Sequence, residues 1–116
     1  MCLGLLVGTF SEQHRRSGID IAGELGTPVQ VAANGRVVYA GSGLIGYGRI
    51  IIVKHDERFL TVYAHNSRLV ANEGDNVRRG QKIAEMGNTD ADRVQLHFEI
   101  RLDGKPVNPL RFLPKV

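Results

Sequence analysis

Residues 94–102 (VQLHFEIRL) alternate apolar and polar side chains without interruption. Because side chains two positions apart share one face of a β-strand, this segment predicts a strand with an apolar core face and a polar outer face. The polar face consists of Gln95, His97, Glu99 and Arg101. Asp103-Gly104 follows at once, and this dipeptide is a strong signal for a two-residue hairpin turn.

Short strand patterns recur along the chain, whereas helical periodicity is nearly absent. Many of the 14 glycines lie between β-branched runs, an arrangement typical of an all-β protein with many turns. Further strands are predicted at residues 35–40, 49–54 and 59–64, with a turn at residues 55–58. Pro106 and Pro109 are expected to interrupt regular structure, with one helical turn near residues 109–113.

Two segments, residues 26–38 and 74–84, resemble each other. Each has a glycine-led turn, a valine, a second glycine and a short apolar strand. This pseudo-repeat favours a compact antiparallel β-sandwich made of two similar hairpin halves. The chain is long enough for one core, so residues 1–116 are expected to form a single domain. Residues 1–10 are interpreted as an N-terminal strand or the edge of a longer chain.

The amino-acid composition excludes several classes of protein. With 42% hydrophobic and 23% charged residues, the chain reads as a soluble globular domain and not as a disordered tail. Its longest apolar runs are far shorter than the roughly 20 residues that a membrane helix needs. The net charge of +3 comes from scattered basic residues without interleaved aromatics, which argues against a nucleic-acid groove. A single cysteine, Cys2, excludes an internal disulfide and a cysteine metal cluster.

Three polar residues are predicted to meet on one sheet. Asp20 stands between two isoleucines, so its carboxylate is expected to face away from a core. His65 ends the strand pattern of residues 59–65, on the predicted face of Phe59, Thr61 and Tyr63. Together with His97, these residues are expected to lie on the concave side of the sheet.

A structural role is the alternative for each of these side chains. A histidine in a strand is usually a hydrogen-bonded structural residue, and Asp20 could equally be a solvated turn acid. His55 lies in the predicted turn and His14 in a charged loop, and neither is assigned to the site.

Seven short segments, spread over nearly the whole chain, together resemble a LytM domain, the lysostaphin-like zinc metallopeptidase family. They are residues 17–22 (SGIDIA), 35–41 (GRVVYAG), 46–48 (GYG), 52–55 (IVKH), 63–66 (YAHN), 80–84 (GQKIA) and 96–101 (LHFEIR). The resemblance implies the barrel-sandwich hybrid version of the antiparallel sandwich that this family uses.

Active members of that family carry His-x-x-x-Asp in the first motif and His-x-His in the last. On this pattern Asp20 and His97 match two zinc ligands, and His65 matches a catalytic histidine. Arg16 stands at the position of the remaining zinc ligand, and Gln95 stands at that of the second catalytic histidine. A guanidinium has no lone pair to offer a metal, and an amide does not titrate near neutral pH.

The resemblance therefore implies a degenerate domain with no metal, no cofactor and no catalytic residue of its own. Arg16 is expected to place its guanidinium near Asp20 in place of zinc, with a solvent-facing Arg16 as the alternative. Replacement of the missing ligand by His14 is disfavoured, because it would require a different loop path.

The resemblance is strongest to regulatory members, and it implies a protein that activates a periplasmic N-acetylmuramoyl-L-alanine amidase during daughter-cell separation. The parent is expected to be a lipoprotein of the outer membrane, with the amidase as partner and peptidoglycan as a second ligand. A groove for the partner is assigned to Arg16, Asp20, Tyr47, His65, Gln95 and His97. Two alternatives remain: a weak zinc-dependent peptidoglycan endopeptidase, and a peptidoglycan-binding module without amidase activation.

Overall fold

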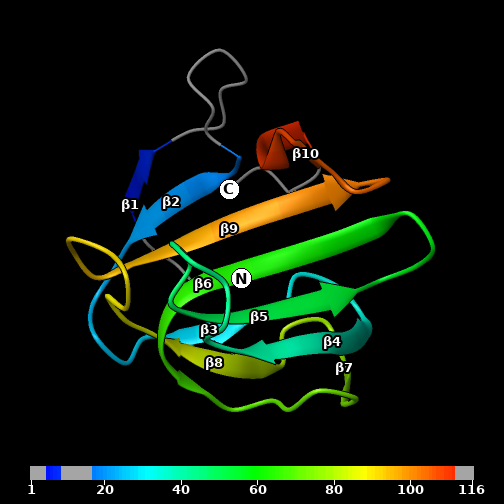
Figure 1. Cartoon of the computed structure of the whole chain (residues 1–116), viewed down its shortest axis with the longest axis horizontal. Coiled ribbons are helices and arrows are strands. Elements are labelled where there is room, and N and C mark those ends of the chain that lie inside the picture. Colours follow the sequence, from blue (N-terminus) through cyan, green and yellow to red (C-terminus); the bar gives the residue numbers. More distant parts are fainter. Residues whose placement is uncertain (1–4, 9–16, 112–116) are drawn as a thin grey trace.

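The computed structural model describes residues 5–8 and 17–111, and within them the protein is almost entirely β (Figure 1). The strands are β1 (Leu5–Gly8), β2 (Ile19–Ala22), β3 (Pro28–Gln30), β4 (Gly35–Gly41), β5 (Arg49–Lys54), β6 (Phe59–Leu69), β7 (Asn76–Val77), β8 (Lys82–Met86), β9 (Gln95–Leu102) and β10 (Lys105–Val107). A short 3₁₀ helix, η1 (Pro109–Arg111), follows β10. No helix in these ranges is long and apolar enough to cross a membrane.

The sheet places β9 between β2 and β6, in the order β1-β2-β9-β6-β5-β4-β7, and every pairing in it is antiparallel. The all-β prediction is confirmed, and β5 and β9 follow the predicted bounds closely. β6 is longer than predicted, because it continues past residue 64 to Leu69 and pairs there with β8. The hairpin signal is also confirmed, since Asp103 and Gly104 have φ of 53° and 81° and join β9 to β10.

Pro106 does not interrupt regular structure as expected. It lies within β10 and opposes Arg101 of β9. Proline cannot donate to a ladder, and β10 tolerates it because, among the described strands, β10 pairs with β9 alone. The helical turn predicted near residues 109–113 is present as η1 in the part that the structure describes.

The two similar segments do not form separate hairpins, so that expectation is wrong. β3 of the first segment pairs with β8 of the second, and the start of β4 pairs with β7. Strands of each segment therefore have a hydrogen-bonding partner in the other segment. A crossed pairing of this kind ties the two halves into one sandwich, which confirms the predicted architecture by a different route.

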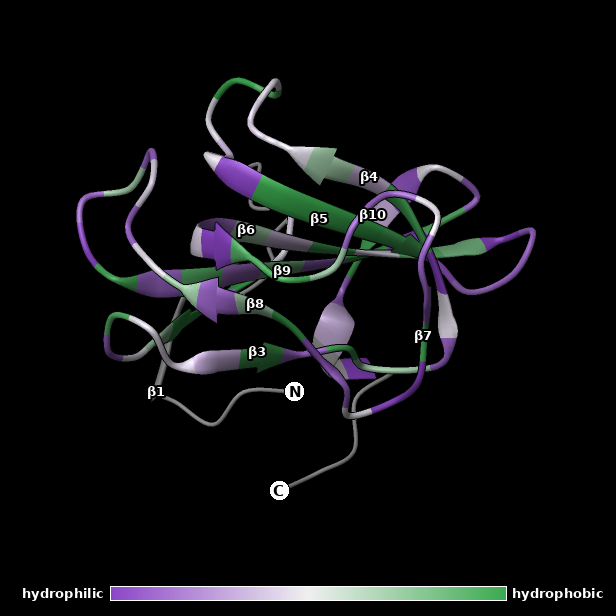
Figure 2. Cartoon of the chain, turned by 90° about the horizontal axis from the view of Figure 1, so that it is seen from below, coloured by the Kyte–Doolittle hydropathy of each residue, from purple (hydrophilic) through white to green (hydrophobic). Residues whose placement is uncertain are grey.

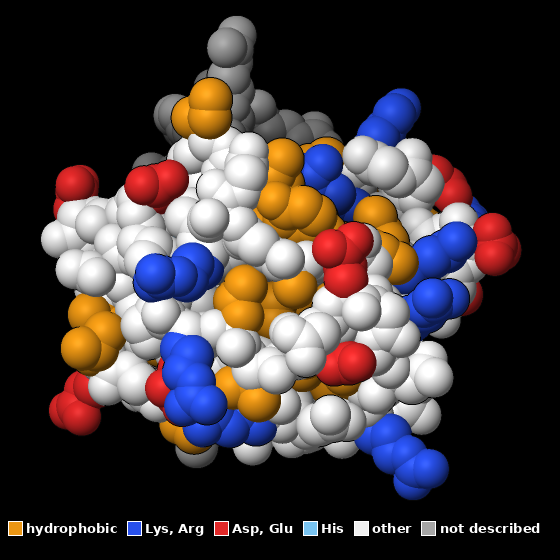
Figure 3. Space-filling view, turned by 60° about the horizontal axis from the view of Figure 1, so that its bottom comes forward, with side chains coloured by type: hydrophobic (Ala, Val, Ile, Leu, Met, Phe, Trp, Pro, Cys, Tyr) orange, Lys and Arg blue, Asp and Glu red, His pale blue; other side chains and the backbone are white. Residues whose placement is uncertain are grey.

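The core lies between the β5, β6 and β9 layer and the β3 and β8 layer (Figure 2). It includes Ile51 from β5, Phe98 from β9, Val29 from β3 and Ile83 from β8. Burial of such aliphatic side chains contributes about 1.5–3 kcal/mol each. On the face shown in Figure 3, hydrophobic side chains reach the surface only in small patches, with Lys and Arg side chains among them.

Candidate functional site

The register of β2 and β9 places Asp20 directly opposite His97. Ile19 and Ile21 are buried in the core, so Asp20 faces the other side of the sheet, as the sequence predicts. The Asp20 carboxylate lies 2.6 Å from Nδ1 of His97, at hydrogen-bonding distance. Local alternation on two strands is therefore enough to bring this pair together.

Glu99, two residues after His97 on the same face of β9, is completely buried. One carboxylate oxygen accepts from Nε2 of His97 and from the Ser17 hydroxyl, both at 2.8 Å. The other accepts from Nε and Nη2 of Arg101, at 2.9 and 2.8 Å. A buried carboxylate is costly without partners, and here both of its oxygens are satisfied by charged or hydroxyl donors. We call Asp20, His97, Glu99 and Arg101 the charged cluster.

His97 is held as an imidazolium. Both of its ring nitrogens face carboxylates, which accept when ionised, so both nitrogens carry protons. Burial opposes the charge on His97, but the hydrogen bonds to Asp20 and Glu99 outweigh it and raise the pKa to about 9. Burial likewise opposes the charge on Glu99, yet hydrogen bonds from His97, Ser17 and Arg101 lower its pKa to about 2. The cluster therefore contains two anions and two cations.

His65 reaches this face through a break in strand alternation. Ala64 lies opposite His97, so strict alternation would turn His65 toward the core with Tyr63. His65 instead has a φ of 68°, and its ring centroid lies 6.1 Å from that of His97. The prediction that His65 meets His97 is confirmed. The predicted sharing of a face with Thr61 and Tyr63 is wrong, since Tyr63 is a core residue and Thr61 is buried and hydrogen-bonded to it.

A bulge in β6 produces this turn. The register pairs Arg49 with Asn66 and Ile51 with Tyr63, so Ala64 and His65 together oppose a single residue of β5. The Asn66 amide donates to the carbonyls of Arg49 and Tyr63 at 3.0 and 2.9 Å. These bonds satisfy one carbonyl on β5 and one on β6, next to the bulge.

Thr89, from the loop after β8, closes the bulge from outside. Its hydroxyl donates to the Asn66 carbonyl at 2.8 Å and accepts from the Arg49 amide at 3.1 Å. Its carbonyl accepts from Nδ1 of His65 at 2.7 Å, which fixes the orientation of the ring. The His65 amide donates to the Tyr47 carbonyl at 2.8 Å. We call Asn66 and Thr89 the bulge latch.

Tyr47 lies beside His97 at this site. Its ring centroid lies 6.0 Å from that of His97, and its hydroxyl accepts from Arg101 at 3.3 Å. Burial, followed by the nearby charge of Glu99, raises the pKa of Tyr47, so its hydroxyl stays neutral. Gln95 is half-buried, two positions before His97 on β9.

The structure therefore brings together Asp20, Tyr47, His65 and His97 of the predicted groove. Arg16 lies outside the described residues, as does His14, and the approach of the Arg16 guanidinium to Asp20 stays a prediction. Glu99 and Arg101 are predicted from the sequence to lie on the polar face of β9, but neither is predicted as a site residue. One sequence feature pointed to them: Glu99 lies two positions after His97, on the polar face of a strand whose other face is apolar.

Residues 14–109 match the model of Peptidase family M23. The chain belongs to this peptidase family. It is 58% identical over 113 residues to the Lipoprotein NlpD/LppB homolog of Pseudomonas aeruginosa, covering 97% of this chain and 38% of that protein. It is 50% identical over 113 residues to the Murein hydrolase activator NlpD of Escherichia coli, covering 97% of this chain and 30% of that protein. The chain thus spans a little over a third of the length of the first relative and less than a third of the second.

A crystal structure of a putative peptidase M23 from Pseudomonas aeruginosa has the same fold, with a TM-score of 0.89 and 28% sequence identity. The match covers 97% of this chain and 48% of that chain. This likeness and the family match confirm the predicted LytM fold.

Among the described residues of this M23 domain, the donors do not fit a catalytic zinc ion. Zinc sites of hydrolases use three protein ligands and a water, and an imidazole ligand must have a free lone pair. His97 has none while both nitrogens hold protons for Asp20 and Glu99. Among the described residues, no group of three or more His, Cys, Asp or Glu side chains is arranged to hold a metal.

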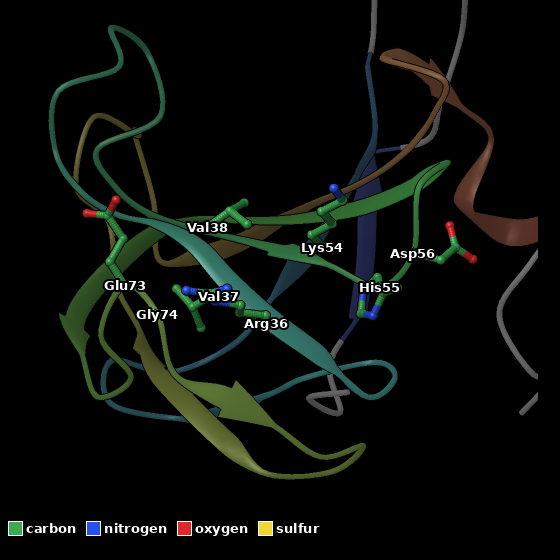
Figure 4. Close-up of a pocket in the computed structure, with 8 residues that line it drawn as sticks. All are labelled: Arg36, Val37, Val38, Lys54, His55, Asp56, Glu73 and Gly74. Carbon is green, nitrogen blue, oxygen red and sulfur yellow. The ribbon is translucent and has the colours of Figure 1, made fainter.

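A separate depression of 610 Å³ lies over β4 and β5 (Figure 4), and no residue of the charged cluster lines it. His55 lines it, but its ring nitrogens lie 2.7 Å from the Asn34 carbonyl and 2.7 Å from the Thr61 hydroxyl. Asp56 accepts from the amides of Arg58 and Phe59 and so caps the β5–β6 turn. The structural role predicted for His55 agrees with these contacts.

Proposed function

We propose that this M23 domain is a non-catalytic activator of a peptidoglycan hydrolase, and that the hydrolase is an N-acetylmuramoyl-L-alanine amidase of the periplasm. One observation carries the proposal: His97 is bonded through both ring nitrogens, to Asp20 and to Glu99. The relative from Escherichia coli, named a murein hydrolase activator, supports the same role.

The mechanism that suits such a site is selective binding. A hydrolase that alternates between closed and open states is activated by any partner that binds the open state more tightly. The polar face beside the charged cluster offers Asp20, Tyr47, His65 and Gln95, with Arg16 as a further predicted member. Because Asp20 and Glu99 balance the charge of His97 and fix its ring, the surface is preorganised and loses little entropy on binding.

Envelope attachment belongs to the same proposal. The Pseudomonas aeruginosa relative is named a lipoprotein, which supports a parent protein anchored to the outer membrane. The domain would then act on its partner in the periplasm at sites of daughter-cell separation.

The decisive experiment measures release of labelled fragments from purified sacculi. A purified amidase is assayed alone and with saturating domain, and the domain is assayed alone with and without Zn²⁺. We expect faster release only when amidase and domain are combined. Fragments released by the domain with zinc would instead support the endopeptidase alternative, and sacculus binding without faster release would support a binding module.

A matched pair of variants locates the partner surface. Gln95→Ala alters the polar face of β9, whereas Gln30→Ala alters another half-buried glutamine, on β3. We expect Gln95→Ala to raise the domain concentration needed for half-maximal activation by about tenfold, the effect of losing one buried polar contact. Gln30→Ala is expected to have no effect. Equal activation by both variants would show that the partner does not contact this face of β9.

A further inference from the structure

The loop between β4 and β5 presents the most exposed large hydrophobic side chain of the described residues. Ile45, in this loop, is 99% exposed, and its neighbour Leu44 is 40% exposed. Figure 2 shows the loop projecting from the β5, β6 and β9 layer on the side away from β3 and β8. Asp20 and His97 face that side too, because the residues that flank them on their strands belong to the core. An aliphatic side chain therefore stands in water on the side of the molecule that carries the polar face.

A glycine turn holds Ile45 in this position. The Tyr47 amide donates to the Leu44 carbonyl at 3.4 Å, and Gly46 has a φ of 88°. A positive φ at the third residue is what a type II turn requires, and glycine adopts it without strain. Ile45 thus occupies the second position, at the corner of the turn, and its exposure follows from that place.

Hydrogen bonds hold the loop on both sides of this turn. Before it, the Gly43 amide donates to the Tyr39 hydroxyl at 2.9 Å. After it, the Tyr47 carbonyl accepts from the His65 amide at 2.8 Å, and the Tyr47 ring centroid lies 6.0 Å from that of His97. A loop that is already ordered in the free protein loses little conformational entropy on binding. The turn that carries Ile45 is therefore preorganised and continuous with the candidate site.

We propose that Ile45 is the apolar anchor of the hydrolase interface, and that it enters an apolar pocket of the hydrolase while the polar face orients that partner. This inference rests on the proposed function, since it concerns the same partner. Ile45 is unburied in the free domain, so a pocket that covers it gains nearly the whole burial of an isoleucine side chain. The polar face yields less, because its groups exchange hydrogen bonds to water for hydrogen bonds to the partner. Ile45 therefore sets the affinity, and the continuity of its loop with the polar face through Tyr47 favours a protein that contacts both.

A second glycine turn provides a matched control. Leu25 is 68% exposed at the corresponding corner, where the Thr27 amide donates to the Glu24 carbonyl at 3.1 Å and Gly26 has a φ of 88°. This turn leads directly into β3, in the layer on the other side of the core (Figure 2). Leu25 thus matches Ile45 in local structure and differs from it in position.

The sacculus assay with amidase tests the anchor. We expect Ile45→Ser to raise the domain concentration needed for half-maximal activation by about ten- to hundredfold, the effect of losing the burial of one large aliphatic side chain. The maximal rate at saturating domain should not change, because the polar face is intact. Leu25→Ser is expected to leave both quantities unchanged, and Ile45→Leu is expected to retain most of the affinity. Both serine changes replace exposed side chains, so the midpoint of thermal unfolding should stay that of the unmodified domain.

Two results would overturn the proposal. The first is an equal half-maximal concentration for Ile45→Ser and Leu25→Ser. The second is binding to vesicles of phosphatidylethanolamine and phosphatidylglycerol that Ile45→Ser abolishes while activation is unchanged, which would assign the loop to a lipid surface. Direct binding of the domain to the amidase separates this proposal from the proposed function. Amidase binding that depends on Ile45, without faster release from sacculi, refutes the activator role alone, and full activation by Ile45→Ser at the concentrations of the unmodified domain refutes the anchor alone.

Discussion

His97 illustrates how a metal-site position can be stabilised without a metal. A zinc ion would bring positive charge between Asp20 and the histidine, and here the second proton on His97 supplies positive charge instead. Glu99 accepts the other ring N–H, at Nε2, and Arg101 completes the balance of charges. Zinc would have to displace a proton whose pKa is about 9. We therefore expect the charged cluster to disfavour metal binding at His97 at neutral pH.

Replacing Glu99 with Gln should be strongly destabilising. The change keeps the side-chain shape but removes the buried anion, so His97 and Arg101 lose their shared partner. We expect a loss of about 3 kcal/mol in the free energy of unfolding in urea. Glu57→Gln, whose side chain is 94% exposed, is the control and should change stability by less than about 0.5 kcal/mol. Equal effects of the two changes would contradict the buried ion cluster.

Stability should depend on pH through His97. Its pKa rises from 6.5 to about 9 on folding, so its contribution is complete below pH 6.5 and is lost as the pH rises through 9. We expect a fall of about 3 kcal/mol in the free energy of unfolding over that range. Among the described residues, the charged or titratable groups around its ring are Asp20 on β2, Glu99 on β9, Tyr47 on its loop and His65 on β6.

The control for this pH dependence is His97→Gln, which should flatten the stability curve between pH 6.5 and 9. Glu99 acts at the opposite end, since its pKa falls from 4.5 to about 2, and its contribution is lost as the pH falls through 2. Both contributions include the same His97–Glu99 contact, so they do not add. Proton NMR of the His97 ring provides the direct check, and a midpoint near 6.5 would contradict the cluster.

At the scale of elements, the bulge of β6 decides where His65 lies. A non-glycine residue at positive φ costs about 1–2 kcal/mol, so the surrounding bonds must compensate for it. The bulge latch does this from two directions, with Asn66 within β6 and Thr89 from the loop after β8. β6 therefore presents Ala64 and His65 on the same side as His97, which a regular strand cannot do.

Asn66→Ala should destabilise the bulge of β6. Two carbonyls would lose their donor, and we expect a loss of about 1–3 kcal/mol in stability. The same change should reduce hydrogen-exchange protection of the His65 amide, which donates to Tyr47. Asn72→Ala, at an exposed turn after β6, serves as control. Unchanged protection at His65 would show that the bulge persists without the latch.

At the scale of the whole molecule, the crossed pairing of β3 with β8 and of β4 with β7 joins the two similar segments directly. The core between the layers receives side chains from both halves, so loss of packing in one half weakens the other. The charged cluster lies on β2 and β9, outside both halves, but β9 contacts the same core through Leu96, Phe98 and Ile100. We therefore expect the site and the sandwich to unfold together.

Val29→Ala tests this cooperativity. Val29 is completely buried in β3, and truncation should cost about 2 kcal/mol through lost burial and a cavity. Unfolding of the variant, followed at the His97 ring and at core methyl groups, should give the same midpoint with both probes. That midpoint should be lower than in the unmodified domain. Val38→Ala, at a valine that is 41% exposed, should change the unfolding midpoint little. Separate midpoints for the two probes would contradict a single cooperative unit.

Local patterns were sufficient for much of the architecture. Alternation in residues 94–102 determined which side chains of β9 enter the core, because the period of two is a property of the strand itself. The Asp103-Gly104 turn followed from two residues that tolerate positive φ. The Asp20–His97 pair followed from the same alternation, once the family resemblance had placed the two segments in one domain.

What only the tertiary structure decided depends on contacts between distant segments. His65 turns toward His97 because Arg49 and Thr89, far from it in sequence, bond to residues around the bulge. The imidazolium state of His97 depends on the burial of Glu99 and its bonds from Ser17 and Arg101, which a strand pattern does not record. The pairing of strands between the two similar segments is likewise decided by the shared core. A glycine turn determines only the local bend of the chain, and it does not determine which distant strand becomes the hydrogen-bonding partner.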